Sequence, residues 1–185
     1  MRWLKALLGL GNPTENWVEH PQRRLEFDLS RNALCGVGLG EPIERLSFLG
    51  PSAEWKPSLV FPRKGIGVDF QHGRIESFLL NLSDEWVAKY GKFTGSFRHE
   101  DEPIVLADEA SQQEALDLFG EPYWIDRDAD DTVFFYEHGR IEWQIEFTSK
   151  GLSVIIVSAS PLLAREEQRK AYGVTKPWPP TDPPR

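Results

Sequence analysis

Three aspartates alternate along one short stretch of the chain, in a pattern that could bind calcium. Asp126, Asp128 and Asp130 are followed by Glu137, eleven residues after the first. Calcium loops of the EF-hand type carry carboxylates at positions one, three and five, and a glutamate at position twelve. The sixth position, which needs glycine for a sharp turn, is Asp131 here, and a strand-like run follows. We interpret the stretch as a solvated acidic loop and predict no cofactor. Asp126, Asp128, Asp130 and Glu137 remain the candidate metal ligands.

Histidine could supply acid–base chemistry, and two of the four histidines stand in a repeated motif. The pentapeptide His-Gly-Arg-Ile-Glu occurs at His72–Glu76 and again at His138–Glu142. We expect residues shared by two copies to build the scaffold, with the arginine and glutamate as surface or cross-strand charge partners. His20 and His99 have no local partner that indicates a catalytic triad. We predict a protein that is not an enzyme. The alternative is a hydrolase that uses His20 or His99 with carboxylates of the acidic loops.

Seven tryptophans give this chain of 185 residues large aromatic side chains that could bind a partner. Tryptophan is enriched among the residues that dominate the energy of protein–protein binding. We therefore predict another protein as the partner. The candidate contact residues are Trp55, Trp86, Trp124 and Trp143. The alternative for each is ordinary packing in the core, which we expect for at least half of them and for Trp143 above all.

Charge and cysteine content narrow the classes of partner and the compartment. The formal net charge is −8, which disfavours a broad contact with nucleic acid because phosphates require a positive surface. The partner that an acidic surface fits is a basic protein. Cys35 is the sole cysteine, so no intrachain disulfide or cysteine zinc cluster can form. We predict a cytoplasmic location.

The first residues carry one apolar face. Trp3, Leu4, Leu7 and Leu8 fall on the same side of a helix. This face could lie on a membrane surface, which leaves a peripheral membrane protein as a further alternative. The same face could instead dock on the protein's own core. The apolar run Ala6–Leu10 is too short for a signal peptide, and no stretch reaches the roughly 20 apolar residues of a membrane span.

Two further motifs accompany each copy of the pentapeptide. A Gly-Glu-Pro precedes it and a Tyr-Gly follows it, in the same order both times, at Gly40–Pro42 with Tyr90–Gly91 and at Gly120–Pro122 with Tyr172–Gly173. Recurrence in a fixed order indicates that one structural unit was duplicated. We predict four segments: a helical extension over 1–26, repeat units over 27–91 and 92–173, and a proline-rich tail over 174–185.

The second unit has the clearer local signals. Ser111 and Glu114 form a capping box that starts a helix, and Gly120 ends it. An antiparallel meander then follows, with a glycine turn at His138-Gly139. Its strands are predicted at 132–137, 141–147 and 152–157, the second with clean alternation and the third apolar on both faces. A closing helix is predicted from Ser160-Pro161 to Tyr172.

The first unit is a looser version of the same plan. We predict a short helix from Ser30 through Cys35, strands before and after the turn at His72-Gly73, and a closing helix over Asp84–Tyr90. After Ile75 the apolar positions change parity, which indicates either a bulge or a strand covered on both faces. A short strand around Thr94–Phe97 is expected in the connection between the units.

The helix that ends in Leu118-Phe119-Gly120-Glu121-Pro122, followed by strands with an aromatic pair and a glycine turn, resembles the β-lactamase inhibitor protein family. It is also similar to the small SmpA-like lipoproteins of outer-membrane assembly. The resemblance covers residues 27–83 and 100–159. It implies two units side by side whose concave sheet face grips another protein. The chain departs from both families, because it has no lipobox cysteine and a single cysteine cannot form the inhibitors' disulfides.

Together these patterns predict an α+β protein of two tandem repeats, each a helix, an antiparallel β-meander and a closing helix. The predicted function is a non-catalytic protein-binding module, inhibitor-like or immunity-like, that uses aromatic residues on sheet faces and loops.

Overall fold

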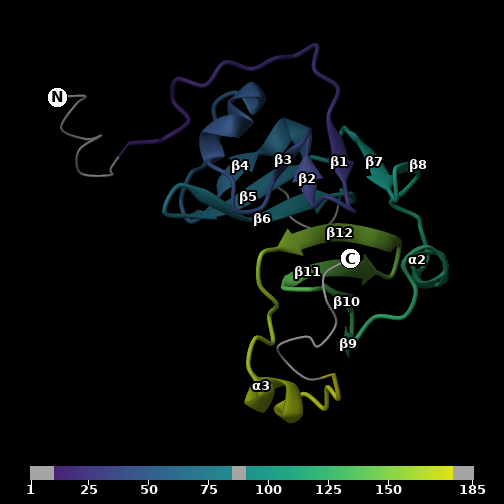
Figure 1. The fold of residues 1–185 in the computed structure, drawn as a ribbon. Helices are drawn as coiled ribbons and strands as arrows, with labels where there is room; N and C mark the ends of the chain where they lie inside the picture. Colours follow the sequence, from purple (N-terminus) through teal and green to yellow (C-terminus); the bar gives the residue numbers. More distant parts are fainter. Residues whose placement is uncertain (1–10, 85–90, 177–185) are drawn as a thin grey trace.

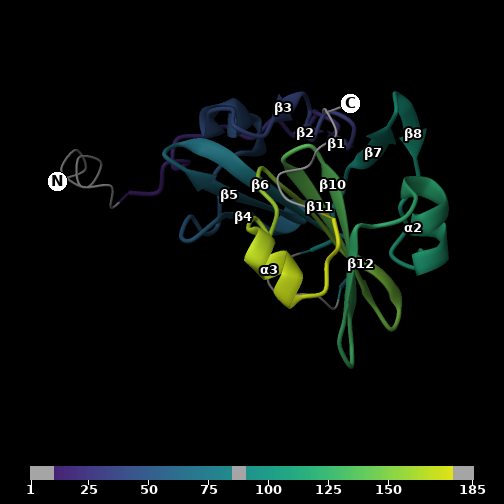
Figure 2. The same cartoon turned by 60° about the horizontal axis from the view of Figure 1, so that its bottom comes forward.

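The computed structural model describes residues 11–84 and 91–176, and strands make up most of its regular structure (Figures 1 and 2). The helices of the described residues are short: the 3₁₀ helices η1 (Ile43–Leu49) and η2 (Pro62–Lys64), α2 (Gln112–Phe119) and α3 (Glu166–Ala171). The strands form two sheets. The prediction of an α+β fold built from helix–meander–helix repeats is therefore wrong, and the protein is mostly β.

The larger sheet has seven antiparallel strands in the order β4-β5-β6-β12-β11-β10-β9. Their bounds are β4 (Leu59–Phe61), β5 (Ile66–Gln71), β6 (Arg74–Asn81), β9 (Trp124–Arg127), β10 (Thr132–His138), β11 (Ile141–Thr148) and β12 (Gly151–Ser158). Two meanders, β4–β6 and β9–β12, join where β6 pairs with β12. The three strands predicted for the second unit are confirmed, and β12 lies between β6 and β11, as its two apolar faces require.

Both copies of the pentapeptide form hairpin turns in this sheet, but in different registers. In the first hairpin Gln71 pairs with Arg74, so the turn residues are His72 and Gly73, both with positive φ. In the second His138 pairs with Ile141, so the turn shifts by one residue to Gly139 and Arg140. The surroundings also differ. Gly40–Pro42 hydrogen-bonds to the first hairpin, whereas Gly120 ends α2. Duplication of a unit stays a prediction.

The change of parity in β6 is explained by a β-bulge. Phe70 pairs with Ile75 while Asp69 pairs with Ser77, which leaves Glu76 as the extra residue. The bulge lets Ile75 and Phe78 point to the same side of the sheet although they are three residues apart. Both are fully buried.

The smaller sheet has five strands in the order β3-β2-β1-β7-β8. Their bounds are β1 (Glu26–Asp28), β2 (Ala33–Leu34), β3 (Val37–Gly38), β7 (Ser96–His99) and β8 (Glu102–Ile104). β1 and β7 are parallel, and the other pairs are antiparallel. This sheet packs on the larger one, and the core lies between them (Figure 1). Phe27 of β1 meets Phe78 of β6 edge-on at 5.4 Å between ring centroids. β7 overlaps the strand predicted around Thr94–Phe97.

The helix predicted from Ser30 through Cys35 is absent, and β2 and β3 occupy this region instead. Asn32, Cys35 and Gly36 all have positive φ, and such residues interrupt an α-helix. The carboxylate of Asp28 also accepts a hydrogen bond from the backbone N–H of Arg31, which favours a turn over a helix. The closing helix predicted over Asp84–Tyr90 lies, from residue 85 on, outside the described residues.

α2 and α3 lie on opposite sides of the larger sheet's C-terminal meander. α2 lies beside β8, whereas α3 lies on the face away from the smaller sheet (Figures 1 and 2). α3 starts at Glu166, not at the predicted Ser160-Pro161. The physical reason is that the preceding backbone serves the sheet, since Ala159 N–H donates to Glu76 O and Leu162 N–H donates to the Glu142 carboxylate.

Within the described ranges no helix is both long and apolar enough to cross a membrane. The predicted lipid-facing residues Trp3, Leu4, Leu7 and Leu8 lie outside those ranges, as does the proline-rich tail from residue 177.

Candidate functional site

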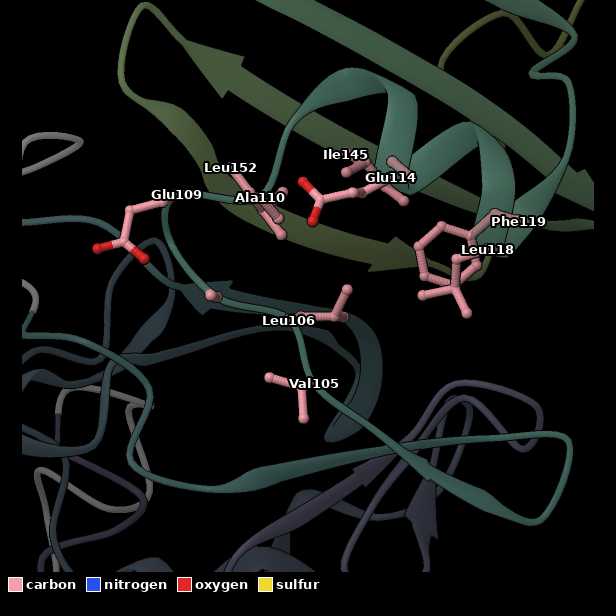
Figure 3. A pocket seen from close by; sticks show the side chains of 11 residues that line it. Val105, Leu106, Glu109, Ala110, Glu114, Leu118, Phe119, Ile145 and Leu152 are labelled. Atoms are coloured by element: carbon pink, nitrogen blue, oxygen red, sulfur yellow. The ribbon is translucent and has the colours of Figure 1, made fainter.

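An apolar groove lies between α2, the segment that leads into it, and strands β11 and β12 (Figure 3). Its cavity volume is about 330 Å³. Most lining side chains are apolar: Val105, Leu106, Ala107, Ala110, Ala115, Leu118, Phe119, Ile145 and Leu152, with Glu109 and Glu114 as the charged ones. Val105 and Leu106 come from the extended segment, and Leu118 and Phe119 from the last turn of α2 (Figure 3). The two walls of the groove, the extended segment and α2, therefore follow each other closely in the sequence.

Local sequence signals fix α2 as one wall. The predicted capping box is confirmed, because Ser111 Oγ accepts from Glu114 N–H at 3.2 Å and Ser111 N–H donates to Glu114 Oε2 at 2.7 Å. The helix ends at Gly120, whose carbonyl accepts from the Tyr136 hydroxyl at 3.1 Å. Burial raises the pKa of Tyr136 to about 12. Both ends of α2 are thus tied, which holds Leu118 at the groove.

The other wall is pinned to the turn between β11 and β12. Leu152 N–H donates to Ala110 O at 3.0 Å. Gly151 has a φ of +129°, and a Cβ built there would stand 2.5 Å from Asp108 O, so only glycine allows this approach. Lys92 Nζ lies 2.5 Å from Asp108 Oδ2. Its hydrogen bond lowers the pKa of Asp108 and keeps it ionised.

The charge at the groove is negative. Hydrogen bonds from the backbone and side chain of Ser111 lower the pKa of Glu114, which is therefore a carboxylate at neutral pH. Glu109 adds a second, exposed carboxylate, and none of the described residues that line the groove is basic. Val105 beside them is 91% exposed. An exposed apolar hollow with a carboxylate rim suits an apolar group that carries a neighbouring cation.

Comparisons with protein families, with curated proteins and with solved structures find no match for this chain.

Trp55, Trp124 and Trp143, the predicted anchors that the structure describes, do not line this groove and lie apart from one another. Trp55 is half-buried before β4, with Lys56 Nζ 4.2 Å from its ring centroid. Trp124 lies on β9, at the opposite edge of the sheet. Trp143 is 2% exposed, between the two sheets, and its Nε1 donates to Asn32 Oδ1 at 2.6 Å. Trp86 lies outside the described residues.

The acidic loop is organised by its own backbone. Asp128 Oδ1 accepts from the N–H groups of Asp130 and Asp131, each at 3.0 Å. These bonds lower the pKa of Asp128. Asp126 is exposed on β9, whereas Glu137 points away from the loop and its side chain is fully buried. In residues 11–84 and 91–176, no three His, Cys, Asp or Glu side chains are placed to hold a metal ion.

A buried polar network on the outer face of the sheet was missed by the sequence reasoning. Glu137 forms an ion pair with Arg169 of α3, whose side chain is 2% exposed. Its cross-strand neighbour Glu142 accepts from the Tyr123 hydroxyl at 2.6 Å and from Leu162 N–H at 3.0 Å.

Glu142 was predicted to be a surface or cross-strand charge partner. The surface alternative is wrong, because the residue is fully buried. Burial raises the pKa of the Glu142 carboxyl. Burial, and next the hydrogen bond to Glu142, raise the pKa of Tyr123. The register pairs Glu137 with Glu142 directly across β10 and β11. Two glutamates that face each other across a hairpin repel, so their pairing was the sequence signal that a basic side chain lies nearby.

The histidines occupy four different environments. His72 is a turn residue, and His138 lies against Trp143 at 4.0 Å between ring centroids. His99 Nδ1 is 3.3 Å from Ser30 Oγ, which also accepts a 2.7 Å hydrogen bond from Glu100 N–H. The His99 ring otherwise meets the edges of Phe119 and Trp143. His20 lies in a separate polar cleft.

Proposed function

We propose that this chain is a non-catalytic protein-binding module whose groove along α2 holds an apolar side chain of a basic partner. The observation that carries the proposal is the groove itself: an apolar hollow with exposed Val105 at its mouth and the carboxylates of Glu109 and Glu114 as its charged lining. An apolar hollow with a few charged groups in its lining has the usual form of a binding site.

The size of the groove favours side-chain recognition. Its volume of about 330 Å³ is at the lower end of the roughly 300–1,000 Å³ of small-molecule sites. The carboxylates lie at the same groove as the apolar residues, so a segment with lysine or arginine beside a leucine-like residue satisfies both. Such a small contact binds weakly unless other surfaces contribute.

The anchors expected from the sequence take a secondary place in this proposal. Trp124 is the described tryptophan with the most suitable position, since it stacks on Phe135 at 4.3 Å on an edge strand. Inhibitor-like or immunity-like action, and a cytoplasmic location with Cys35 as a free thiol, belong to the proposal as further expectations.

Selection from a random peptide library tests the proposal. We expect the selected peptides to share an apolar residue next to lysine or arginine, with affinity that falls as salt rises. Val105→Ser and Leu118→Ser together should lower the affinity about tenfold or more, because both remove apolar area from the groove.

Val18→Ser is the matched control, because Val18 is 69% exposed and does not line the groove. Glu109→Gln should weaken the binding of basic peptides without loss of the fold. Peptides that bind the double variant as tightly as the parent protein, or that lack basic residues, would contradict the proposal.

A further inference from the structure

A second, polar cleft lies where the segment before β1 passes η2 and the start of β7. Its volume is about 710 Å³. It is unlike the groove along α2, because hydrogen-bond donors dominate its lining. These are His20, Gln22, Arg23, Arg24, Lys64, Thr94 and Ser96. Three cationic side chains therefore converge with two exposed hydroxyls, on a protein whose formal net charge is −8.

One carboxylate, Glu19, shares the cleft and partly offsets this charge. It forms an ion pair with Lys64, which lowers the pKa of Glu19 and keeps it ionised. Arg23 is oriented, since its guanidinium lies 4.0 Å from the Phe48 ring centroid and donates to Cys35 O at 3.1 Å. Arg24 differs, because in the described part of the chain its guanidinium has no hydrogen bond or ion pair. It is exposed and available.

The backbone around the cleft is held in place. His20 N–H donates to Phe48 O at 2.9 Å, and Arg23 N–H to His20 O at 3.0 Å, which fixes the turn that carries the arginines. On the opposite wall, a Cβ built on Gly95 would stand 2.7 Å from Leu25 O. This close approach sets the spacing between the arginine segment and the hydroxyls. The backbone that carries the donors is thus pre-positioned, which lowers the entropic cost of ligand binding.

We propose that this cleft binds a small ligand through a phosphate group. Guanidinium groups bind phosphate through paired N–H donors, and hydroxyl and ammonium groups complete such sites. Arg24 supplies the uncommitted charge, and Arg23 and Lys64 add positive potential. Thr94 offers a hydroxyl donor, and the Ser96 hydroxyl, which donates to Leu25 O at a long 3.5 Å, can turn to a ligand. The acidic remainder of the chain opposes a long polyanion, so the ligand is a compact anion and not a nucleic acid.

Two probes stand for the possible sources of the phosphate, and the probe that binds more tightly identifies the source. Inorganic phosphate stands for the free anion, and phenyl phosphate for a phosphate ester of an organic ligand. Each is titrated into the full chain at fixed ionic strength, balanced with sodium chloride, and binding is followed by backbone amide shifts in ¹H–¹⁵N spectra. Both should shift the amides of residues 19–25 and 94–96 with saturation. Shifts that do not saturate, or that chloride reproduces, would overturn the proposal.

Three variants make the test specific. Arg24→Gln should weaken phosphate binding about tenfold, which is the effect expected for loss of one charge-assisted contact. Glu19→Gln should instead strengthen binding about threefold, since it removes a repelling charge and releases Lys64. Arg127→Gln on β9 is the control, with the same change of net charge at the far edge of the sheet, and should bind as the parent does.

The opposite signs exclude a trivial explanation. A misfolded variant loses binding, so stronger binding by Glu19→Gln cannot come from damage to the fold. Equal losses in Arg24→Gln and Arg127→Gln would show attraction to overall charge only and would overturn the assignment. No change in Arg24→Gln, or weaker binding in Glu19→Gln, would do the same.

Discussion

The ion pair that attaches α3 to the sheet gives the sharpest prediction of stability. In Arg169→Met, Glu137 loses its main partner, while its side chain stays fully buried with Lys176 Nζ at 3.3 Å. The carbonyls of Leu163 and Lys176, which accept from the guanidinium at 2.9 and 3.0 Å, also lose their donor. We expect a large loss, because the substitution leaves a buried charge without adequate compensation.

The magnitude follows from the burial. Removal of one partner from a buried ion pair costs roughly 3–5 kcal/mol. With an m-value of about 2 kcal/mol per molar, the urea midpoint should fall by about 1.5–2.5 M. An upper limit applies: if α3 leaves the sheet locally, Glu137 regains water and the global loss stops at the free energy of that local opening.

Urea unfolding followed by tryptophan fluorescence measures the global loss, and amide hydrogen exchange in α3 detects local opening. Arg165→Met is the control on the same segment, since Arg165 is exposed and should change stability by no more than about 0.5 kcal/mol. The double variant Glu137→Gln/Arg169→Met should lose less stability than the sum of the two single losses, by about 2 kcal/mol or more. Additive losses, or an Arg169→Met variant as stable as the control, would refute the reasoning.

Three further predictions concern other buried groups. Burial raises the folded-state pKa of Glu142 above its unfolded value, so the folded state binds more protons between those two values. The stability of the parent relative to Glu142→Gln should then rise as the pH falls through the folded-state pKa toward the ordinary pKa of glutamate, and parallel urea midpoints would contradict this. Gly65→Ala should cost more than about 3 kcal/mol, because its Cβ would stand 2.2 Å from Phe93 N, whereas Gly36→Ala, with open space around it, should cost about 1–2 kcal/mol. If calorimetry finds the same loss of stability in Gly65→Ala and Gly36→Ala, the close approach of Phe93 to Gly65 is not what determines the cost. Trp143→Phe should cost about 1–3 kcal/mol, since it leaves Asn32 Oδ1 buried without its donor. Asn32→Gly, which tolerates the positive φ at this position, should add little more in that background.

What the sequence predicted well is local. The capping box of α2 and the strict alternation of Ile141–Phe147 each depend on residues within a few positions, so the helix and the second meander could be placed in advance. The first unit could not. Its helix prediction near Ser30 overlooked the positive φ of Asn32 and Cys35, and the parallel pairing of β1 with β7 has no local signal.

The functional surfaces follow the same division. The groove along α2 depends on a chain reversal that brings Val105 toward Leu118, and apolar residues in a connecting segment carry no pattern that predicts it. The partner of Glu137 is Arg169, 32 residues later, so the sequence revealed facing carboxylates but not the cation between them. The polar cleft likewise joins Arg24 to Ser96 across the parallel strands.

The pairing of β6 with β12 has a kinetic consequence. Each meander consists of neighbouring hairpins, which form within microseconds. Their union aligns Ser77 with Ser158 and Asn81 with Val154, across a long intervening chain, and such distant partners meet slowly. We therefore expect the two meanders to form early and the pairing of β6 with β12 to form last. Until it does, two apolar strand edges remain open, and the nascent protein is most vulnerable to aggregation at that stage.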